Sequence, residues 1–245
     1  MKKLIALALA LCLSSAQAQM ALTGAGGQSP VPSVGGSVSF DAASASPTAF
    51  VGSTTTNNTV TGSGAANSVA IAALAIQPAA TSISCTYDPT GANISLTQLI
   101  NIEASDSTVY ARIFGAPIGT GSASSKTISC SWTGSAGGNI VAEIYKGANQ
   151  TGGATTFPNT ASTAGAASAT TSISITSAPG HISTDMATQT AGNVTSTNQT
   201  LISSVSNAGC CGIGASVSTS PGSTATFTWS GSNSAWAHVG VDISN

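Results

Sequence analysis

Charged residues are scarce in this sequence. They make up 5% of the 245 residues, with five lysines and arginines, seven aspartates and glutamates, and two histidines. Proteins that bind nucleic acid need a dense field of lysine and arginine to meet the phosphate backbone. The composition therefore argues against a nucleic-acid partner, and equally against attraction to an anionic membrane surface.

Long hydrophobic runs are also missing, since the longest one beyond the N-terminal region, 69–76, has only the length of a strand. The N-terminus carries Lys2 and Lys3, then the apolar run 4–13, and then a short stretch that ends Ala16-Gln17-Ala18. This order is typical of a secretory signal peptide. The apolar run is too short for a bilayer, which needs about 20 residues. We expect export to the medium, the cell surface or the periplasm, and no membrane insertion of the mature chain.

Aromatic residues are few, at 4%, but the apolar fraction of 41% is too high for a typical disordered chain. Valine, isoleucine and threonine recur in short alternating stretches, and such β-branched residues favour strands. Turn signals separate these stretches at 88–91, 178–180, 220–223 and 231–234. Strands are predicted at 37–42, 57–62, 67–76, 81–87, 108–114, 126–133, 139–146, 171–177, 182–186, 213–219, 225–229 and 235–243.

These elements predict an all-β fold, namely a two-sheet antiparallel β-sandwich of jelly-roll or concanavalin-like form. One short helix is expected near 94–103, because Leu96, Leu99 and Ile100 have helical spacing. The predicted organisation is a signal peptide at 1–18, a flexible leader at 19–36 and a single β-sandwich domain at 37–245.

Four cysteines lie outside the signal peptide, and an even number in an exported protein predicts disulfides. The segments 83–87 and 128–132 share one pattern, in which an isoleucine, a cysteine and an aromatic residue occupy one face of a strand. This match favours a bond between Cys85 and Cys130. Cys210 and Cys211 are adjacent, so a bond between them and separate bonds to other partners both remain open. No ligand spacing for a metal accompanies the cysteines, and we expect no metal or cofactor.

Residues for catalysis are few. His238 precedes Asp242 by four residues on a predicted strand, which puts them roughly 13 Å apart, so His238 is expected to be a surface residue. Glu103 and Glu143 are the only glutamates and form the default pair for a glycoside hydrolase, but both are expected to be solvated. The chain has no G-x-S-x-G motif. We expect no catalytic residues and no enzymatic activity.

Aromatic residues offer the remaining signal for binding. Trp132 and Trp229 share strand faces with apolar residues, so both are expected in the core. Trp236 lies on the face opposite to the apolar residues of the last strand and is expected at the surface. The predicted ligand-contact surface consists of Trp236, Tyr110, Tyr145 and Arg112.

Several segments carry a family resemblance: Ser172-Ile-Ser-Ile-Thr-Ser-Ala-Pro-Gly180, Met186-Ala-Thr, Thr226-Phe-Thr-Trp-Ser, Trp236-Ala-His-Val-Gly-Val-Asp-Ile243 and Ile140-Val-Ala-Glu-Ile-Tyr145. Through them the chain resembles Gly/Ser/Thr-rich β-sandwich surface modules of bacterial exported proteins and of phage tail-fibre and other virion-surface chains. The resemblance covers framework strands and turns, and it implies surface display or adhesion without catalytic residues. The signal peptide and the cysteines fit the exported bacterial branch better.

We therefore expect a secreted or cell-surface structural or adhesion-type protein, with a surface glycan or a protein as its partner. The first alternative is a secreted concanavalin-like glycoside hydrolase that uses Glu103 and Glu143. The second is an ice-binding protein, suggested by the threonine, alanine and cysteine content, although no fixed-period Thr-x-Thr ladder occurs. The identity of the ligand and the oligomeric state are left open by these patterns.

Overall fold

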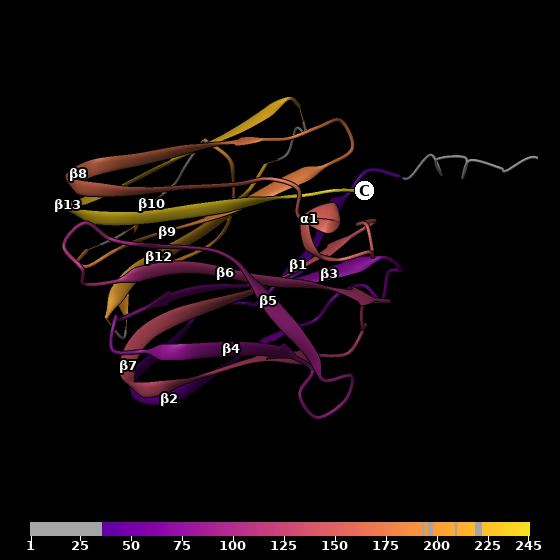
Figure 1. Cartoon of the computed structure of the whole chain (residues 1–245), viewed down its shortest axis with the longest axis horizontal. Coiled ribbons are helices and arrows are strands. Elements are labelled where there is room, and N and C mark those ends of the chain that lie inside the picture. The colour runs from indigo at the N-terminus through magenta and orange to yellow at the C-terminus, as the bar shows by residue number, and fades with distance from the viewer. Residues whose placement is uncertain (1–35, 193, 196–197, 209, 219–221) are drawn as a thin grey trace, which may run out of the picture. The chain divides into compact units, whose positions relative to one another are not determined.

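A computed structural model describes residues 36–245, apart from 193, 196–197, 209 and 219–221. The predicted signal peptide and nearly all of the predicted leader lie outside the described residues. The described residues belong to one compact unit, which is all-β as predicted and consists of two antiparallel sheets (Figure 1). The one helix among them, α1 (Gly153–Thr156), is a single turn, and no described helix is long and apolar enough to cross a bilayer.

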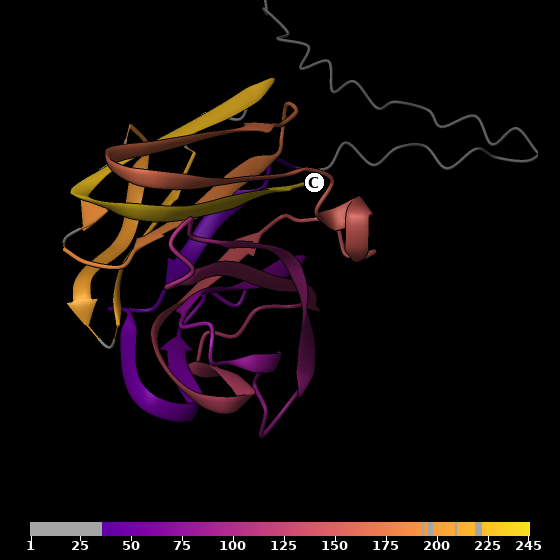
Figure 2. The same cartoon turned by 60° about the vertical axis from the view of Figure 1, so that its left-hand side comes forward.

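The first sheet closes on itself. Its strands follow the order β1-β7-β3-β6-β5-β4, and β7 also pairs with β4, so that β4, β5, β6, β3 and β7 form a five-stranded barrel, seen as a ring in Figure 2. The predicted pair of sheets is thus confirmed, but the barrel is not the simple layer of a jelly-roll sandwich. The strands are β1 (Ser39–Ala43), β2 (Thr48–Val60), β3 (Ser68–Ile76), β4 (Thr81–Tyr87), β5 (Ile94–Glu103), β6 (Tyr110–Gly119) and β7 (Lys126–Lys146).

Strand β7 closes the barrel because it is long and strongly bent. Its first part pairs with β4 and its second part with β3, while β2 borders the opposite edge of both parts. Gly134 lies between the two parts with φ of 93°, a conformation that glycine adopts without strain. The sequence predicted separate strands at 126–133 and 139–146, and the glycine-rich bend between them explains why the pattern was interrupted.

The interior of the barrel is filled by apolar side chains that include Leu74, Phe114 and Trp132. Cys85 of β4 and Cys130 of β7 are direct cross-strand neighbours within this interior, with their Cα atoms 4.1 Å apart. The two cysteines lie at disulfide distance, which confirms the predicted pairing. The bond joins the two strands at which the barrel closes.

The second sheet follows the order β10-β13-β9-β12-β11, with β8 paired to β13. One face of this sheet packs on the outer wall of the barrel, where Ile71 and Val141 of the barrel belong to one buried cluster with Met186, Ile213 and Val239. Its strands are β8 (Thr160–Thr176), β9 (Ile182–Gln189), β10 (Val194–Thr195), β11 (Thr200–Ala208), β12 (Cys211–Val217) and β13 (Thr224–Ile243).

The other face of this sheet is covered by an extension of its own strands. Residues 170–176 of β8 pair with 224–230 of β13, and we call this two-stranded ribbon the arm. The ring of Trp229 packs directly on Gly214 of β12, and the arm's isoleucines pack on Gly240 of β13. All eight residues of β9 are consequently buried, because the strand has the barrel on one side and the arm on the other.

The helix expected near 94–103 is absent, and this prediction is wrong. The segment forms strand β5, in which a register shift falls between Gln98 and Ile100. Leu96 packs inside the barrel, whereas Leu99 and Ile100 pack against the outer cluster. Because of the bulge, the apolar residues before it and after it lie on opposite faces of the strand. This change of face gives Leu96, Leu99 and Ile100 the spacing expected of a helix.

The predicted turn at 231–234 is also absent. β13 continues through these residues with register shifts on either side of Ser234, so two predicted strands are one. The turn at 178–180 is confirmed by Gly180, which has φ of 87°. The turn at 220–223 includes residues outside the described part, and β11 was not predicted.

Removal of the barrel disulfide should destabilise the protein markedly. The cysteines are 45 residues apart, and closure of a loop of that length contributes about 4 kcal/mol in the chain-entropy view. We predict that Cys85→Ala/Cys130→Ala lowers the free energy of urea unfolding by about this amount. The matched control, Cys210→Ala/Cys211→Ala, removes two sulfur atoms but almost no loop. Equal losses in the two variants would contradict the prediction.

Glycine at position 214 is predicted to be required for the arm to pack. A Cβ atom at this position would overlap the ring of Trp229, whose indole nitrogen is tied to Asp185 and cannot move freely. Gly214→Ala should therefore cost about 1–3 kcal/mol of stability in thermal or urea unfolding. A Cβ at Gly36 would meet no atom within 4 Å, so Gly36→Ala is the neutral control. A Gly214→Ala variant as stable as this control would disprove the packing argument.

Candidate functional site

The carboxylate of Asp185 lies at the centre of a buried polar network between β9, β12 and β13. Its Oδ1 accepts hydrogen bonds from the backbone N–H of Ser216 at 3.0 Å and from the Ser216 hydroxyl. Its Oδ2 lies 2.6 Å from Nε1 of Trp229 and 2.8 Å from Nε2 of His238. Asp185 is 1% exposed and His238 0%, so the expectation that His238 is a surface residue is wrong. Its strand face is covered by the arm.

A second network surrounds Asp242 near the end of β13. Its Oδ1 accepts hydrogen bonds from the hydroxyls of Ser177 at 2.7 Å and Ser183 at 3.0 Å, and its Oδ2 lies 2.7 Å from Nδ1 of His181. Each histidine is thus paired with an aspartate distant in sequence, and His238 and Asp242 do not form a pair. Every oxygen of both aspartates has a hydrogen-bond partner.

The His238 network has the order of a nucleophile relay, since Nδ1 of its ring is 3.4 Å from Oγ1 of Thr171. Its position argues for a structural role. Thr171, on the inner face of the arm, and His238 beneath the arm are both buried, and a substrate would have to displace the arm to reach them. The network instead joins the arm to β9 and β12, because buried polar groups need partners and these supply them.

Glu143, one half of the predicted glycosidase pair, lies between the barrel and the second sheet. It is 1% exposed, so the expected solvated position is wrong. Its Oε2 is 2.7 Å from the Tyr145 hydroxyl and 3.0 Å from Thr184 Oγ1, while Oε1 has no hydrogen-bond partner. Burial raises the pKa of Glu143 to about 8, and the charge of nearby Asp185 adds to the rise. The carboxyl is therefore protonated at neutral pH.

Glu103, the other half of that pair, does not share a site with Glu143. Its Oε2 accepts a hydrogen bond of 2.9 Å from the Tyr110 hydroxyl at the end of β5. Tyr110 packs with the barrel interior, whereas Glu143 lies in the interface with the second sheet. The structure thus brings no two glutamates together around a substrate-sized space.

Of the four residues of the predicted ligand-contact surface, only Tyr110 and Arg112 are shown in contact with each other. Trp236 and Tyr145 are both 0% exposed, so neither has side-chain surface for a ligand. Arg112 stacks on the ring of Tyr110 with its guanidinium carbon 4.6 Å from the ring centre, and burial lowers the pKa of Arg112. Trp132 and Trp229 are buried as predicted. All three tryptophans are therefore inside the protein.

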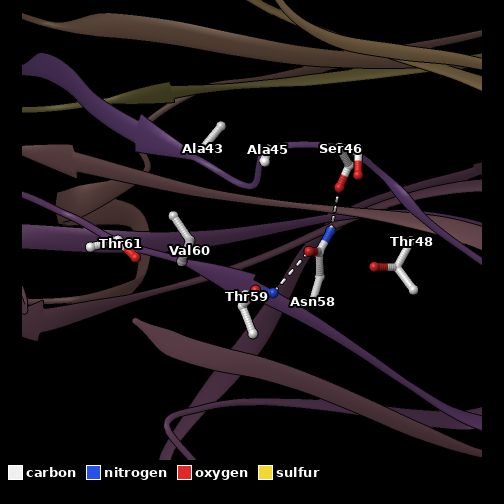
Figure 3. A pocket seen from close by; sticks show the side chains of 8 residues that line it. All are labelled: Ala43, Ala45, Ser46, Thr48, Asn58, Thr59, Val60 and Thr61. Carbon is white, nitrogen blue, oxygen red and sulfur yellow. Dashed lines mark hydrogen bonds between the residues drawn. The ribbon is translucent and has the colours of Figure 1, made fainter. Parts of the chain in front are cut away.

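Two hollows border β1, and a third, of about 420 Å³, lies beside Thr195 and Ser230. The one in Figure 3, of about 450 Å³, lies beside β1 and β2, and its Asn58 amide donates to the carbonyls of Ser46 and Ile140. The other, of about 310 Å³, lies where β1 meets the second sheet and includes Val38, Phe40 and Val217. The described residues around both are uncharged, and neither hollow contains a group suited to acid–base chemistry.

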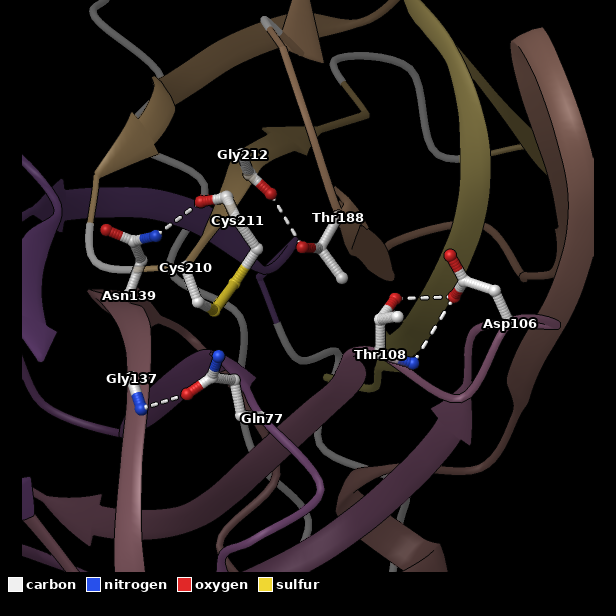
Figure 4. Close-up of a disulfide and its surroundings, with 9 residues drawn as sticks. All are labelled: Gln77, Asp106, Thr108, Gly137, Asn139, Thr188, Cys210, Cys211 and Gly212. Atoms are coloured by element: carbon white, nitrogen blue, oxygen red, sulfur yellow. Dashed lines mark hydrogen bonds between the residues drawn. A yellow bond between two sulfur atoms is a disulfide. The ribbon is translucent and has the colours of Figure 1, made fainter. Parts of the chain in front are cut away.

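Cys210 and Cys211 lie at disulfide distance from each other, so the structure supports the vicinal bond among the possibilities left open (Figure 4). Cys211 is fully buried and accepts a hydrogen bond of 2.6 Å at its carbonyl from the amide of Asn139. The hydroxyl of Thr188 likewise holds the carbonyl of Gly212 at 2.6 Å. These contacts anchor the start of β12 to the barrel and to β9.

The outer wall of the barrel that faces away from the second sheet is polar and uncharged. Alternate residues of β2, β4, β5 and β7 point outward there, opposite to interior residues such as Cys130. Every outward residue in this region carries a hydroxyl or an amide and is exposed or partly exposed. We call it the barrel hydroxyl face, and its members are Thr55, Asn57, Thr59, Ser84, Thr86, Ser95, Thr127, Ser129 and Ser131.

Strand pairing orders these groups into rows. Ser131 of β7 lies between Thr55 of β2 and Ser84 of β4, and the hydroxyls of Ser131 and Ser84 are 3.1 Å apart. Neighbouring strands are about 4.8 Å apart and successive outward residues about 6.8 Å apart, so the groups form a grid. The next row consists of Asn57, Ser129, Thr86 and Ser95.

No member of the grid is ionisable. The ion pair of Lys126 and Asp88, at 2.8 Å, lies at the adjoining strand ends and is internally neutralised. In a pair of bonded hydroxyls one group keeps a free donor and both keep free acceptor positions. The face therefore offers donors and acceptors at fixed, repeated positions without net charge. The patterns of 83–87 and 128–132 predicted the apolar faces of these strands but not the hydroxyl rows opposite them.

Comparison with known proteins adds no assignment, because no family model and no curated protein matches the chain. Among the described residues, no three His, Cys, Asp or Glu side chains converge as a metal site.

The buried carboxyl of Glu143 predicts a specific pH dependence. Its pKa is about 8 in the folded protein and near 4.5 when unfolded. Its contribution to stability is thus complete below pH 4.5 and is lost as pH rises to about 8, with a slope of about 1 kcal/mol per pH unit. Glu143→Gln should flatten the curve of unfolding free energy between pH 5 and 8 and raise stability at pH 7.5. The prediction fails if wild type and variant have parallel curves.

Proposed function

We propose that this chain is an exported structural or adhesion-type surface protein that contacts a neutral, hydroxyl-rich polymer such as a glycan through the barrel hydroxyl face. The observation that carries the proposal is the grid of uncharged hydroxyl and amide groups over four paired strands. A sugar polymer presents the same kind of groups at regular intervals, each able to donate and accept a hydrogen bond.

The rigidity of the face supports this proposal. Its side chains are short and project from paired strands, so little conformational entropy is lost on binding. Each exposed hydrogen bond contributes only about 0.5–1.5 kcal/mol, because it replaces bonds to water. Contacts repeated along a polymer add together. We therefore expect weak binding at each contact but strong binding to a long polymer chain.

The position of the ionisable groups supports a role without catalysis. The Asp185–His238 pair and Asp242 are taken up by internal hydrogen bonds, and Glu143 is buried with one of its two oxygens hydrogen-bonded. The two cysteine pairs are compatible with an oxidising compartment outside the cytosol, in agreement with a secreted or surface location.

Ice is a second candidate ligand. No single strand contains a regular threonine ladder in its sequence, but the grid places hydroxyl groups in regular rows across neighbouring strands. Serine and threonine are mixed in its rows, with Ser129 and Ser131 at the centre. Methyl groups are therefore irregularly placed, which favours a flexible hydrated polymer over a crystal lattice. A thermal hysteresis assay separates the two ligands.

Binding to neutral polysaccharides tests the proposed function. The mature protein should be retained on particles of cellulose, mannan or dextran, with little dependence on salt because no charge is involved. Ser129→Val/Ser131→Val keeps strand-favouring residues but removes two central hydroxyls, and it should weaken retention roughly five-fold.

Thr151→Val, on an exposed loop before α1, is the matched control and should bind as the wild type does. Absence of wild-type retention on all three polymers, or equal retention of the Ser129/Ser131 variant, would count against the proposal.

A further inference from the structure

A second hydroxyl array lies on the outer face of the arm. Its inner face is apolar, with Ile173, Ile175 and Phe227 in one buried cluster, so the alternate residues point away from the protein. All eight are serine or threonine. We call them the arm hydroxyl face, and its members are Thr170, Ser172, Ser174, Thr176, Thr224, Thr226, Thr228 and Ser230.

The pairing of the arm makes this face regular. Its members form four consecutive cross-strand pairs with no register shift between them. The hydroxyls of Ser172 and Thr228 are 3.1 Å apart, and those of Ser174 and Thr226 are 3.0 Å apart. As on the barrel, no member is ionisable, and every member is exposed except Thr228, which is partly exposed.

The two faces point away from each other. The arm covers the side of the second sheet that is remote from the barrel, and β2 and β4 lie on the side of the barrel remote from that sheet. Figures 1 and 2 show the arm strands and the strands β2 and β4 at opposite ends of this unit. One polymer chain lying on the barrel face would therefore leave the arm face free.

We propose that the arm hydroxyl face is a second binding site for the same class of ligand, a neutral hydroxylated polysaccharide, so that one molecule bridges two polymer chains. The inference rests on the proposed function, since it assigns the same ligand to both faces. Charge matching favours this occupant, because eight neutral hydroxyls carry no charge to pair with that of an ionic partner and complement a polymer of neutral hydroxyls. A protein that binds one polymer chain on each face can join two polymer-coated surfaces, as an adhesion protein must.

Agglutination of polysaccharide-coated beads tests the bridging. Beads coated with dextran or mannan, or cellulose particles, are mixed with the mature protein, and retained protein and bead clustering are measured separately. Wild type should be retained and should cluster the beads. Ser172→Val/Ser174→Val removes two arm hydroxyls, and Ser129→Val/Ser131→Val removes two barrel hydroxyls. Each variant should keep measurable retention through its intact face but lose clustering at least ten-fold.

The outcomes separate this inference from the proposed function. Retention of the wild type without clustering overturns the bridging and leaves the proposed function intact. Absence of retention overturns both. Clustering by both variants at the wild-type level shows that the beads are joined by another route and overturns the bridging. Light scattering without beads, expected to show one species for all three proteins, excludes clustering through self-association, and circular dichroism spectra confirm that the variants are folded.

Discussion

The second half of the molecule depends on the hydrogen bonds made by the buried carboxylate of Asp185. An ionisable group in the interior is unfavourable unless it is fully hydrogen-bonded, and its partners here come from three places in the chain. Ser216 holds it to β12, His238 to the end of β13, and Trp229 to the arm. The arm can therefore lie over the sheet only in the register that delivers the indole N–H to this carboxylate.

The packing of the arm on the second sheet determines which residues are exposed to solvent. The central strands become buried on both faces, and both networks, with their histidines and aspartates, are used for cohesion. The tryptophans are likewise inside, at 0% exposure for Trp229 and Trp236. What is left outside is the other half of each alternating strand, in which serine and threonine are the most frequent residues. The same alternation that builds the core thus creates the two hydroxyl faces, and the proposed binding function follows from the way the fold is stabilised.

Much of the fold was visible in the sequence, because alternation is a local signal. It predicted the all-β class, most strands, the Cys85–Cys130 pair and the burial of Trp132 and Trp229. It failed where a strand bulges, as in β5, or passes through a polar, glycine-containing segment, as at 231–234 in β13, because both interrupt the periodicity without ending the strand.

The candidate site was harder to predict for a different reason. His238 and Trp236 were expected at the surface because their strand seemed to have one buried face. The other face is covered by the arm, in which the paired residues are 48 to 60 positions apart in the sequence. The hydroxyl rows likewise arise from the register between distant strands. Ser129 and Ser131 are unremarkable in a chain so rich in serine until β2 and β4 are placed beside them.

The most direct measurement is nuclear magnetic resonance of the isotopically labelled mature protein, titrated with soluble neutral hexasaccharides of glucose or mannose. The account predicts that shifted backbone amides fall on β2, β4 and the first part of β7, and separately on residues 170–176 and 224–230 of the arm. Amides around the Asp185 network should stay unchanged. Shifts concentrated instead at Arg112 and Tyr110 or in the hollow beside Phe40, or no shifts with any sugar, would contradict the claim that the hydroxyl faces are the contact surfaces.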